Sequence, residues 1–366
     1  MEHEKAVIGF LGAGGIARSH AFCLNSLKYY YSDCPTVELA AVSSARKESM
    51  ESFAAGYGFQ KACPPEELLA DKRISTIFIL GPNKIHYQHF KAAAVMDHVK
   101  RIYLEKPVCS SREEEEGIID IVGSRPGLQV QVGFQYLYTS AVRDALSFWK
   151  SGALGKPIHF EFKYYHSDYL KKSYREKRVT RLTPSPDGGA MADLGSHILS
   201  LLSAFIGENV EITGAVQAGQ YDDVPEGSDL FSQISLFDRE SRAAGTLSAS
   251  RISSGTGDSL SFELYATGGA IRFSSENPDQ FEYYTEESGT WSRKVTGSNY
   301  KPFTSFPSGH VPGGWHRAMM HAHYVFLTNS QTETFVPDIK HGLAVQKLLA
   351  STAEHLAGFR NRTKIS

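Results

Sequence analysis

Residues 5–17 read Lys-Ala-Val-Ile-Gly-Phe-Leu-Gly-Ala-Gly-Gly-Ile-Ala, and they decide the fold that we expect for this chain of 366 residues. Lys5 to Leu11 is a short apolar run of the kind that forms a buried strand. The pattern Gly-x-Gly-x-x-Ala follows at once, and a helical stretch then continues to about Tyr30. A strand, a glycine-rich turn and a helix in this order are typical of a dinucleotide-binding domain.

The small residues of the turn have separate physical tasks. Gly12 allows the tight turn, Gly14 lets the backbone approach a pyrophosphate, and Ala17 permits close packing of the helix on the strand. The start of the helix would face the phosphates, because its free N–H groups and its dipole favour an anion. We therefore expect Gly12, Gly14, Gly15 and Ile16 to contact a dinucleotide. The alternative is a turn that serves packing alone.

The end of the second strand, Val37 to Val42, favours NADP over NAD. NAD-binding chains commonly place an acidic residue there to bind the adenosine ribose, whereas this chain continues with Ser43, Ser44 and Arg46. Hydroxyl donors and the cations of Arg46 and Lys47 suit a ribose 2′-phosphate. We expect NAD or NADP as the cofactor, with a preference for NADP. In the alternative, Arg46 and Lys47 only solvate the start of the next helix.

Two later strands of the same sheet also end in polar residues. Residues 74–80 form one apolar run, and Pro82, Asn83 and His86 follow it. Pro82-Asn83 breaks the strand and starts a helix at the carboxyl edge of the sheet, where the nicotinamide would bind. We therefore expect this loop to line the cofactor.

Leu104-Glu105-Lys106-Pro107 places a lysine where another strand ends. Arg101 to Leu104 has the bulky composition of a strand interior, and Pro107 removes the next backbone donor and keeps Lys106 out of helical geometry. Ligands bind at the carboxyl ends of strands in open α/β sheets. We expect Glu105 and Lys106 on the cofactor side, with Lys106 as a catalytic or substrate-holding group. The alternative is a solvated lysine between two elements.

The remaining chain completes an α/β protein of two domains, because 366 residues exceed what one core organises. Ser111 and Glu114 predict a capping box, and residues 128–134 are the last strand of a doubly wound parallel sheet. We expect an NAD(P)-binding Rossmann domain over 1–134. Short turns between the later strands indicate a mostly antiparallel sheet in a second domain over 135–366, whose last helix, 340–360, could pack back on the first.

Composition narrows the class of partner. The net charge of −2 and the pI near 6.7 give no electrostatic case for nucleic acid or a membrane surface. No stretch approaches the roughly 20 apolar residues of a membrane span, and the first residues lack a signal-peptide pattern. The four cysteines contain no Cys-x-x-Cys pair. We expect a cytoplasmic protein with reduced cysteines and a small neutral or weakly charged substrate.

A later helix, from Met191 to Ile206, carries Asp193 and His197. The separation of four residues puts both side chains on one helical face, so an acid and an imidazole become neighbours. We expect both to take part in catalysis and substrate binding. The alternative is a capping aspartate and a histidine with a purely structural hydrogen bond.

The chain resembles the Gfo/Idh/MocA family, the group of glucose-fructose oxidoreductase and inositol dehydrogenase. The matching motifs are the turn from Gly12 to Ala17, Pro82-Asn83 with His86, Glu105-Lys106-Pro107, and Asp193-Leu194-Gly195-Ser196-His197. Their order and spacing agree over nearly the whole chain. The resemblance implies a Rossmann domain, a C-terminal domain with a large, mostly antiparallel sheet, and a homodimer or homotetramer formed through that sheet.

Two departures from the family pattern concern the substrate. Ser200 stands where members often carry an aspartate, and Gln135 begins a segment where an Asn-Pro pair is usual. Both stretches keep hydrogen-bonding side chains that suit a sugar or polyol. Besides Asp193 and His197, the expected substrate-binding residues are Gln135, Tyr165 and Arg178, with Arg181 as a weaker candidate.

Four histidines near the C-terminus invite a metal site, but they offer no compact zinc spacing, so we expect no metal. They are His310, His316, His321 and His323. The expected activity is reversible hydride transfer between NAD(P) and a hydroxyl carbon, with His197 as base, Lys106 against the developing alkoxide, and Asp193 holding one of them or a neighbouring hydroxyl. Two alternatives share the fold: an NAD-dependent glycosidase, and a non-catalytic sugar or dinucleotide-binding regulator.

Overall fold

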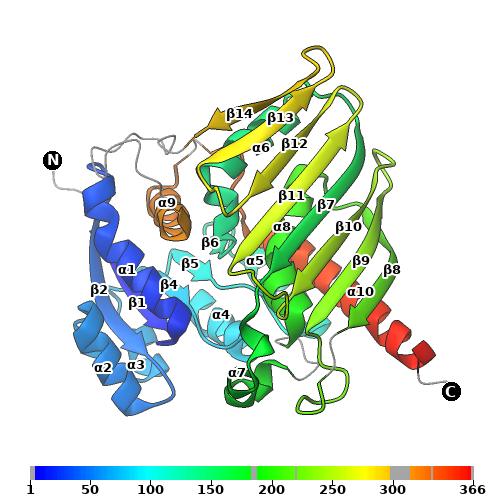
Figure 1. The fold of residues 1–366 in the computed structure, drawn as a ribbon. Helices are drawn as coiled ribbons and strands as arrows, with labels where there is room; N and C mark the ends of the chain where they lie inside the picture. The colour runs from blue at the N-terminus through cyan, green and yellow to red at the C-terminus, as the bar shows by residue number, and fades with distance from the viewer. Residues whose placement is uncertain (1–4, 183–187, 219–220, 297–313, 331–332, 364–366) are drawn as a thin grey trace. The chain divides into compact units, whose positions relative to one another are not determined.

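The computed structural model describes residues 5–182, 188–218, 221–296, 314–330 and 333–363 (Figure 1). The chain divides into two compact units. The first comprises Met1–Tyr138 and Ser298–Gly342, and the second comprises Thr139–Gly297 and Leu343–Ser366. Each unit is built around its own sheet.

The first unit contains a six-stranded, fully parallel sheet in the order β3-β2-β1-β4-β5-β6. The order reverses between β1 and β4, which is the switch point where ligands bind in such sheets. This confirms the expected doubly wound Rossmann fold. The strands are β1 Lys5–Leu11, β2 Thr36–Ser43, β3 Lys61–Ala62, β4 Thr76–Ile79, β5 Arg101–Leu104 and β6 Gln129–Val132.

Helices connect these strands, and the start of the last one, α5, is capped by the residues that the sequence predicted. They are α1 Gly15–Tyr30, α2 Lys47–Tyr57, α3 Pro65–Ala70, α4 His86–Ala94 and α5 Arg112–Ser124. At the start of α5, the Ser111 Oγ accepts a hydrogen bond from the backbone N–H of Glu114 at 3.2 Å. The Glu114 carboxylate reaches back to the backbone N–H of Ser110 at 2.7 Å, one residue before the partner of a standard capping box.

A helix from late in the chain, α9 Gly314–Thr328, completes the core of the first unit. Its residues from Arg317 to Leu327 are all buried, and its apolar side chains pack among those of α1, Phe78 and Tyr103. The following segment reaches β6, where the backbone N–H of Val132 donates to the carbonyl of Pro337 at 2.9 Å. We expected these residues in the second domain. They join the first because β6 is an edge strand, whose unpaired backbone groups can bind another segment.

The second unit is an eight-stranded sheet in the order β14-β13-β12-β11-β7-β10-β9-β8. All its neighbours are antiparallel except β7 and β10, so the expected mostly antiparallel sheet is confirmed. The strands are β7 Pro157–Tyr165, β8 Val210–Ala218, β9 Phe231–Asp238, β10 Ala244–Ser250, β11 Ser259–Ala266, β12 Gly269–Ser274, β13 Gln280–Thr285 and β14 Thr290–Val295.

The two faces of this sheet differ in polarity. On β7, Phe160, Phe162 and Tyr164 are buried, and the residues that alternate with them are polar and half-buried. The helices of this part of the chain are α6 Ser140–Lys150, α7 Lys172–Lys177, α8 Ser196–Phe205 and α10 Ile339–Thr363. The last of these begins in the first unit, and its residues from Leu343 onward belong to the second.

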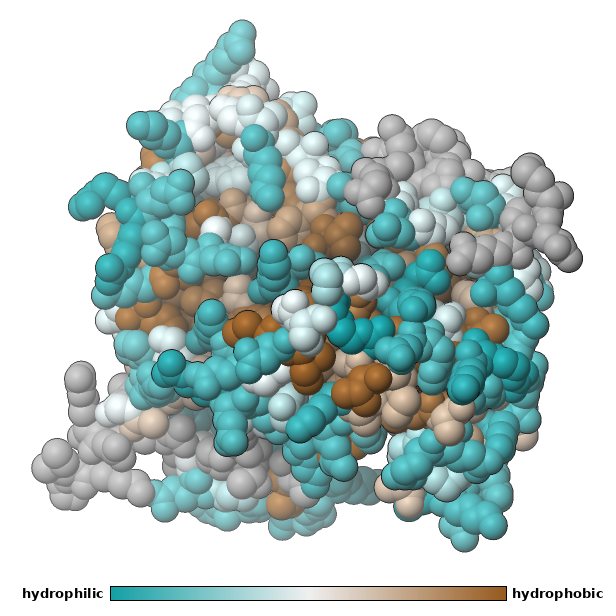
Figure 2. Space-filling model, turned by 180° about the vertical axis from the view of Figure 1, so that it is seen from behind, coloured by the Kyte–Doolittle hydropathy of each residue, from teal (hydrophilic) through white to brown (hydrophobic). Residues whose placement is uncertain are grey.

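Polar side chains cover much of the surface in Figure 2, with apolar residues exposed between them. The large exposed apolar residues include Tyr29, Ile158 and Val295. Within the described ranges, none of the helices has the length and apolar character needed to cross a bilayer.

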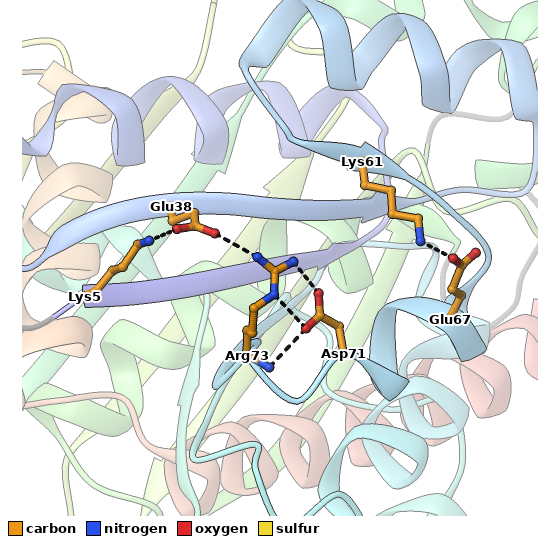
Figure 3. Close-up of polar contacts among 6 residues, drawn as sticks. All are labelled: Lys5, Glu38, Lys61, Glu67, Asp71 and Arg73. Atoms are coloured by element: carbon orange, nitrogen blue, oxygen red, sulfur yellow. Dashed lines mark hydrogen bonds and ion pairs between the residues drawn. The ribbon is translucent and has the colours of Figure 1, made fainter.

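Charged residues link the elements at the amino ends of β1 and β2 (Figure 3). Glu38 pairs with Lys5 and lies 3.6 Å from the Arg73 guanidinium, which also binds Asp71 at 2.7 Å. Nearby, Lys61 pairs with Glu67. Lys5 and Arg73 are mostly exposed, so these pairs contribute little to stability.

Candidate active site

Gly12 ends β1 in a turn that only glycine fits. Its φ is +134°, and a Cβ there would lie 2.6 Å from the carbonyl carbon of Leu80 and 2.7 Å from the backbone nitrogen of Gly81. The Gly12 N–H donates to the carbonyl of Ser43 at 2.9 Å. The turn is therefore held between the carboxyl ends of β2 and β4 by backbone contacts on both sides.

The next two glycines face open space instead. A Cβ added at Gly14 or Gly15 would meet no atom of the described residues within 4 Å, its chain neighbours aside. Helix α1 begins at Gly15, and its N-cap residue, Gly14, has no side chain to cap the N–H groups of the first turn. Ala17 is fully buried, which agrees with close packing of α1 on the sheet. The site fits the phosphates of a dinucleotide, since it offers room, donors and a helix N-terminus together.

The residues after β2 provide the expected hydroxyls and cations, but without a rigid arrangement. Ser43 is buried, Ser44 is half-buried, and Arg46 is exposed at the N-cap of α2. Lys47 is also exposed and lies 3.9 Å from Glu51 of the same helix. Exposed cations of this kind are easily solvated and screened, so their positions alone do not select a cofactor.

The loop after β4 is tied to the turn after β5 by His86. Its Nδ1 lies 2.7 Å from the carbonyl of Pro107, and its Nε2 lies 2.9 Å from the carbonyl of Gly81. Asn83, at the start of the short 3-10 helix Asn83–Ile85, is buried. His86 thus connects two turns at the carboxyl edge of the sheet, which is a structural task that the sequence did not indicate.

Glu105 and Lys106 leave β5 at this same edge. The Glu105 N–H donates to the carbonyl of Ile79 at 3.0 Å, and its side chain is buried. One carboxylate oxygen of Glu105 accepts the backbone N–H of Lys106 at 3.3 Å, and the other lies 2.9 Å from Nε2 of His20. Lys106 is half-buried, and its peptide bond to Pro107 is cis.

In the second unit, Asp193 lies in a π-helical turn, Met191–Gly195, that leads into α8. π-Helical turns are rare and occur frequently at functional sites. The Oδ2 of Asp193 accepts a hydrogen bond from the Arg251 guanidinium at 2.8 Å and lies 3.7 Å from that of Arg181.

Arg251, at the end of β10, was not found from the sequence. Its side chain is fully buried, donates to the carbonyl of Arg181 at 2.8 Å, and stacks over the Tyr169 ring at 4.6 Å. A buried guanidinium at this distance favours the ionised form of Asp193 and fixes its direction.

His197 follows on the first turn of α8 and is buried. Its ring lies 5.9 Å from that of Tyr164, on the buried face of β7. Ser200, one turn later, is also buried. The structure therefore places Asp193 in the π-helical turn and His197 in the first turn of the α-helix that continues it, in place of the single regular helix expected from Met191 to Ile206.

The other expected substrate residues are less closely grouped. Tyr165 follows Tyr164 on β7 and so points to the opposite face of the sheet, where its hydroxyl lies 2.6 Å from that of Ser248. Arg178 is exposed, and its guanidinium lies 4.7 Å from the centre of the Tyr174 ring.

Gln135, in the first unit, is buried and engaged by its own unit. With its amide oriented for both partners, it donates to the carbonyl of Gly133 at 2.8 Å and accepts from the Trp315 indole N–H at 2.7 Å. These bonds leave one amide hydrogen for any further contact.

Two sequence profiles match the chain. Residues 6–134 match the profile described as an oxidoreductase family with an NAD-binding Rossmann fold, and residues 142–272 match the Gfo/Idh/MocA C-terminal domain. The chain belongs to the Gfo/Idh/MocA family. It is therefore an oxidoreductase with an NAD-binding Rossmann domain, and the resemblance inferred from its motifs is confirmed.

Named relatives of this Gfo/Idh/MocA chain act on sugars. Levoglucosan dehydrogenase of Pseudarthrobacter phenanthrenivorans is 24% identical over 300 residues, which is 75% of each chain. Glucose-6-phosphate 3-dehydrogenase of Bacillus subtilis is 28% identical over 211 residues, which is 56% of each chain.

Solved structures share the fold over almost the whole chain. Levoglucosan dehydrogenase in complex with NADH and levoglucosan has a TM-score of 0.85 at 20% identity, covering 97% of this chain and 98% of that one. An inositol dehydrogenase homologue from Azotobacter vinelandii, with NADH and myo-inositol, has a TM-score of 0.80 at 15% identity, covering 97% and 96%.

Two histidines of the late segment of this Gfo/Idh/MocA chain, His321 and His323, are hydrogen bonded to side chains of the first unit. Among the described residues, no group of three or more histidine, cysteine or acidic side chains is arranged to hold a metal ion. His321 binds the Tyr31 hydroxyl at 2.7 Å and Glu333 at 3.0 Å, and His323 binds His20. His310 lies outside the described residues.

Proposed function

We propose that this protein transfers a hydride reversibly between NAD and a hydroxyl carbon of a sugar, polyol or glycoside. The observation that carries the proposal is that both halves of the chain match the family. Lys106, Asp193 and His197 stand in the motifs by which the sequence resembles it. Relatives named for levoglucosan, glucose 6-phosphate and inositol support the substrate class.

Three groups share the chemistry of oxidising an alcohol. A base must take the hydroxyl proton, and we assign it to His197, a neutral imidazole being a suitable acceptor. A positive group must stabilise the oxygen as it gains negative charge, and we assign it to the Lys106 ammonium. The bound nicotinamide supplies the hydride acceptor.

Asp193 has a role that depends on Arg251. With one oxygen bound to a buried guanidinium, its carboxylate has a fixed direction. We propose that it orients Lys106 or His197, or binds a neighbouring hydroxyl of the substrate. Gln135 and Arg178 remain candidates for further substrate contacts, whereas Tyr165 faces the other side of β7 and is a weaker one.

The cofactor proposal is NAD. The family description and relatives solved with NADH support it, and the expected preference for NADP gains no support from them. Titration of both cofactors by fluorescence tests this directly. Tighter binding of NADP, lost in Arg46→Ala, would instead restore the 2′-phosphate interpretation of Ser44 and Arg46.

We also propose a homodimer or homotetramer in which copies pair through the large sheet. The face of β7 opposite the buried one carries His159, Glu161 and Lys163, which are only half-buried within one copy. Sedimentation of the purified protein tests this, and a monomer at micromolar concentration would contradict it.

A panel of sugars and polyols, assayed for reduced-nicotinamide absorbance with each cofactor, tests the activity. We expect reduction of NAD with at least one of them. Nitrophenyl glycosides are the necessary control, because release of nitrophenol without net nicotinamide reduction would identify a glycosidase instead. Absence of both reactions, with intact NAD binding, would favour a regulator.

A further inference from the structure

Next to Lys106 in sequence, Glu105 ends a buried series of three hydrogen-bonded titratable side chains in the first unit. The proposed reaction does not use them. His20 of α1 lies between His323 of α9 and Glu105 at the end of β5. Its Nδ1 is 2.8 Å from Nε2 of His323, and its Nε2 is 2.9 Å from Oε1 of Glu105. Both histidines are fully buried, and the Glu105 side chain is nearly so.

Aromatic rings enclose the two histidines. The His20 ring lies 5.2 Å from that of Tyr103 and 5.7 Å from that of Phe78, and the His323 ring lies 5.4 and 5.3 Å from the same two rings. Such apolar surroundings strengthen hydrogen bonds between buried polar groups and make an unpaired one costly. The three groups therefore depend on one another for their hydrogen bonds.

The positions of the protons follow from one unpaired atom. Burial holds the pKa of His323 well below its ordinary value, so His323 is neutral and carries one ring proton. Its Nδ1 has no hydrogen-bond partner among the described residues. A bare nitrogen is tolerated there more easily than an orphaned N–H, so the proton lies on Nε2 and is donated to Nδ1 of His20.

His20 must then carry its own proton on Nε2, which it donates to Glu105. A doubly protonated His20 would force the proton of His323 onto its unpaired Nδ1, so the same argument excludes it. His323 thus fixes the tautomer of His20. His323 therefore donates to His20, and His20 donates to one carboxylate oxygen of Glu105, whose other oxygen accepts the backbone N–H of Lys106.

Gly133 shows how closely this carboxylate is confined. A Cβ added to Gly133 would lie 2.6 Å from Oε1 of Glu105, the oxygen that His20 binds. Glu105 therefore has a donor on each oxygen and a backbone surface against its side.

We propose that His20 and His323 are positioning residues, which act through Glu105 to hold the main chain of Lys106 in the geometry that the reaction needs. This rests on the proposed function, since it requires Lys106 to take part in the reaction. His20 acts directly on Glu105, and His323 acts by setting the tautomer of His20.

Turnover of variants tests the order in which His323, His20 and Glu105 act. His20→Leu should lower kcat by between about tenfold and a hundredfold, the range typical of residues that orient a reactive group from behind, with unchanged NAD affinity. His323→Leu should cost less, because His20 still adopts the required tautomer part of the time. His20→Gln should recover part of the loss, since its amide also donates to a carboxylate.

His321→Gln is the matched control. His321 is a buried histidine on the same helix, and it contacts the Tyr31 hydroxyl and the Glu333 carboxylate. It should lower the melting temperature and leave kcat close to that of the unmutated protein. An equal loss of kcat in His321→Gln and His323→Leu would mean that any buried polar change in α9 has this effect, and would overturn the proposal.

A double variant separates positioning from general damage. Adding His20→Leu to Lys106→Ala should cost little further turnover if His20 acts through Lys106. A full additional loss would overturn the positioning proposal and leave the role of Lys106 intact. Full turnover in Lys106→Ala alone would overturn the assigned role of Lys106 and the positioning proposal with it.

Histidine ring NMR of the unmutated protein tests the derived proton positions without an activity assay. Nitrogen-15 labelled His20 and His323, assigned through His20→Gln and His323→Leu, should both be neutral and protonated on Nε2 at neutral pH. A proton on Nδ1 of His20, or a doubly protonated ring, would overturn the derived donation from His323 through His20 to Glu105, even if the enzyme acts as proposed.

Discussion

The two ends of the parallel sheet in the first unit carry very different polar groups. At the amino ends, Lys5, Glu38 and Arg73 form exposed ion pairs on the surface (Figure 3). At the carboxyl ends, Glu105 is buried and hydrogen bonded to His20 and to the backbone of Lys106. Polar groups are costly to bury, so their concentration at one end marks the end where chemistry is expected.

The same contrast separates two arginine–aspartate pairs. Arg73 and Asp71 are two residues apart and both reach solvent, whereas Arg251 is fully buried and reaches Asp193, 58 residues earlier. A local exposed pair needs only a turn of the chain to bring its two residues together. A long-range buried pair requires two elements to be held together, so its loss should be felt in both stability and activity.

The largest expected effect is loss of turnover in Lys106→Ala and in His197→Ala. Each should lower kcat by about a hundredfold or more, because a group that acts on the reacting hydroxyl is removed, while NAD binding persists. Lys61→Ala is the control, a lysine of the same sheet whose ion pair with Glu67 is exposed. Near-normal turnover in either variant would remove that residue from the mechanism.

Arg251→Met should destabilise the protein by about 3 kcal/mol, because it leaves Asp193 charged without its buried partner. It should also lower kcat, since the direction of Asp193 is lost. Denaturant unfolding and turnover, measured on the same samples, check both effects. The matched change Arg73→Met should leave the denaturation midpoint nearly unchanged, and equal effects of the two would contradict the comparison between buried and exposed pairs.

Gly12→Ala and Gly14→Ala should differ in kind. At Gly12 the positive φ and the backbone of Leu80 and Gly81 leave no space, so we expect a destabilisation of about 1–3 kcal/mol. At Gly14 the added Cβ meets none of the described residues beyond its chain neighbours, so folding should be unaffected and NAD affinity should fall. Thermal unfolding with and without NAD distinguishes them, and normal NAD affinity in Gly14→Ala would place the cofactor elsewhere.

The smallest expected effect is the pH dependence of stability that comes from Asp71, at the amino end of the parallel sheet. The hydrogen bond from Arg73 holds the pKa of Asp71 below its ordinary value. Since the folded pKa is the lower one, the contribution to stability is complete above about pH 4, the range of an unfolded aspartate, and is lost as the pH falls through the folded value. Urea midpoints of the wild type and Asp71→Asn should converge as the pH is lowered; a constant difference would mean that Arg73 does not hold Asp71.

The sequence determined what depends on neighbouring residues. The strand, glycine turn and helix around Gly12, the end of β5 before Lys106, and the cap of α5 at Ser111 were all predicted, because each depends on backbone geometry within a few residues. The spacing of Asp193 and His197 similarly predicted one shared helical face. Together these motifs gave the family and both kinds of sheet.

The tertiary structure decided which distant residues meet. His20 and His323 are 303 residues apart, and nothing in either local sequence indicates that α9 joins the first unit. Arg251 meets Asp193 because the end of β10 lies beside the π-helical turn Met191–Gly195. Tyr165 faces away from Tyr164 because alternate residues of a strand point to opposite faces. Patterns in sequence report local conformation, whereas the partners of a buried charge depend on which elements the core brings together.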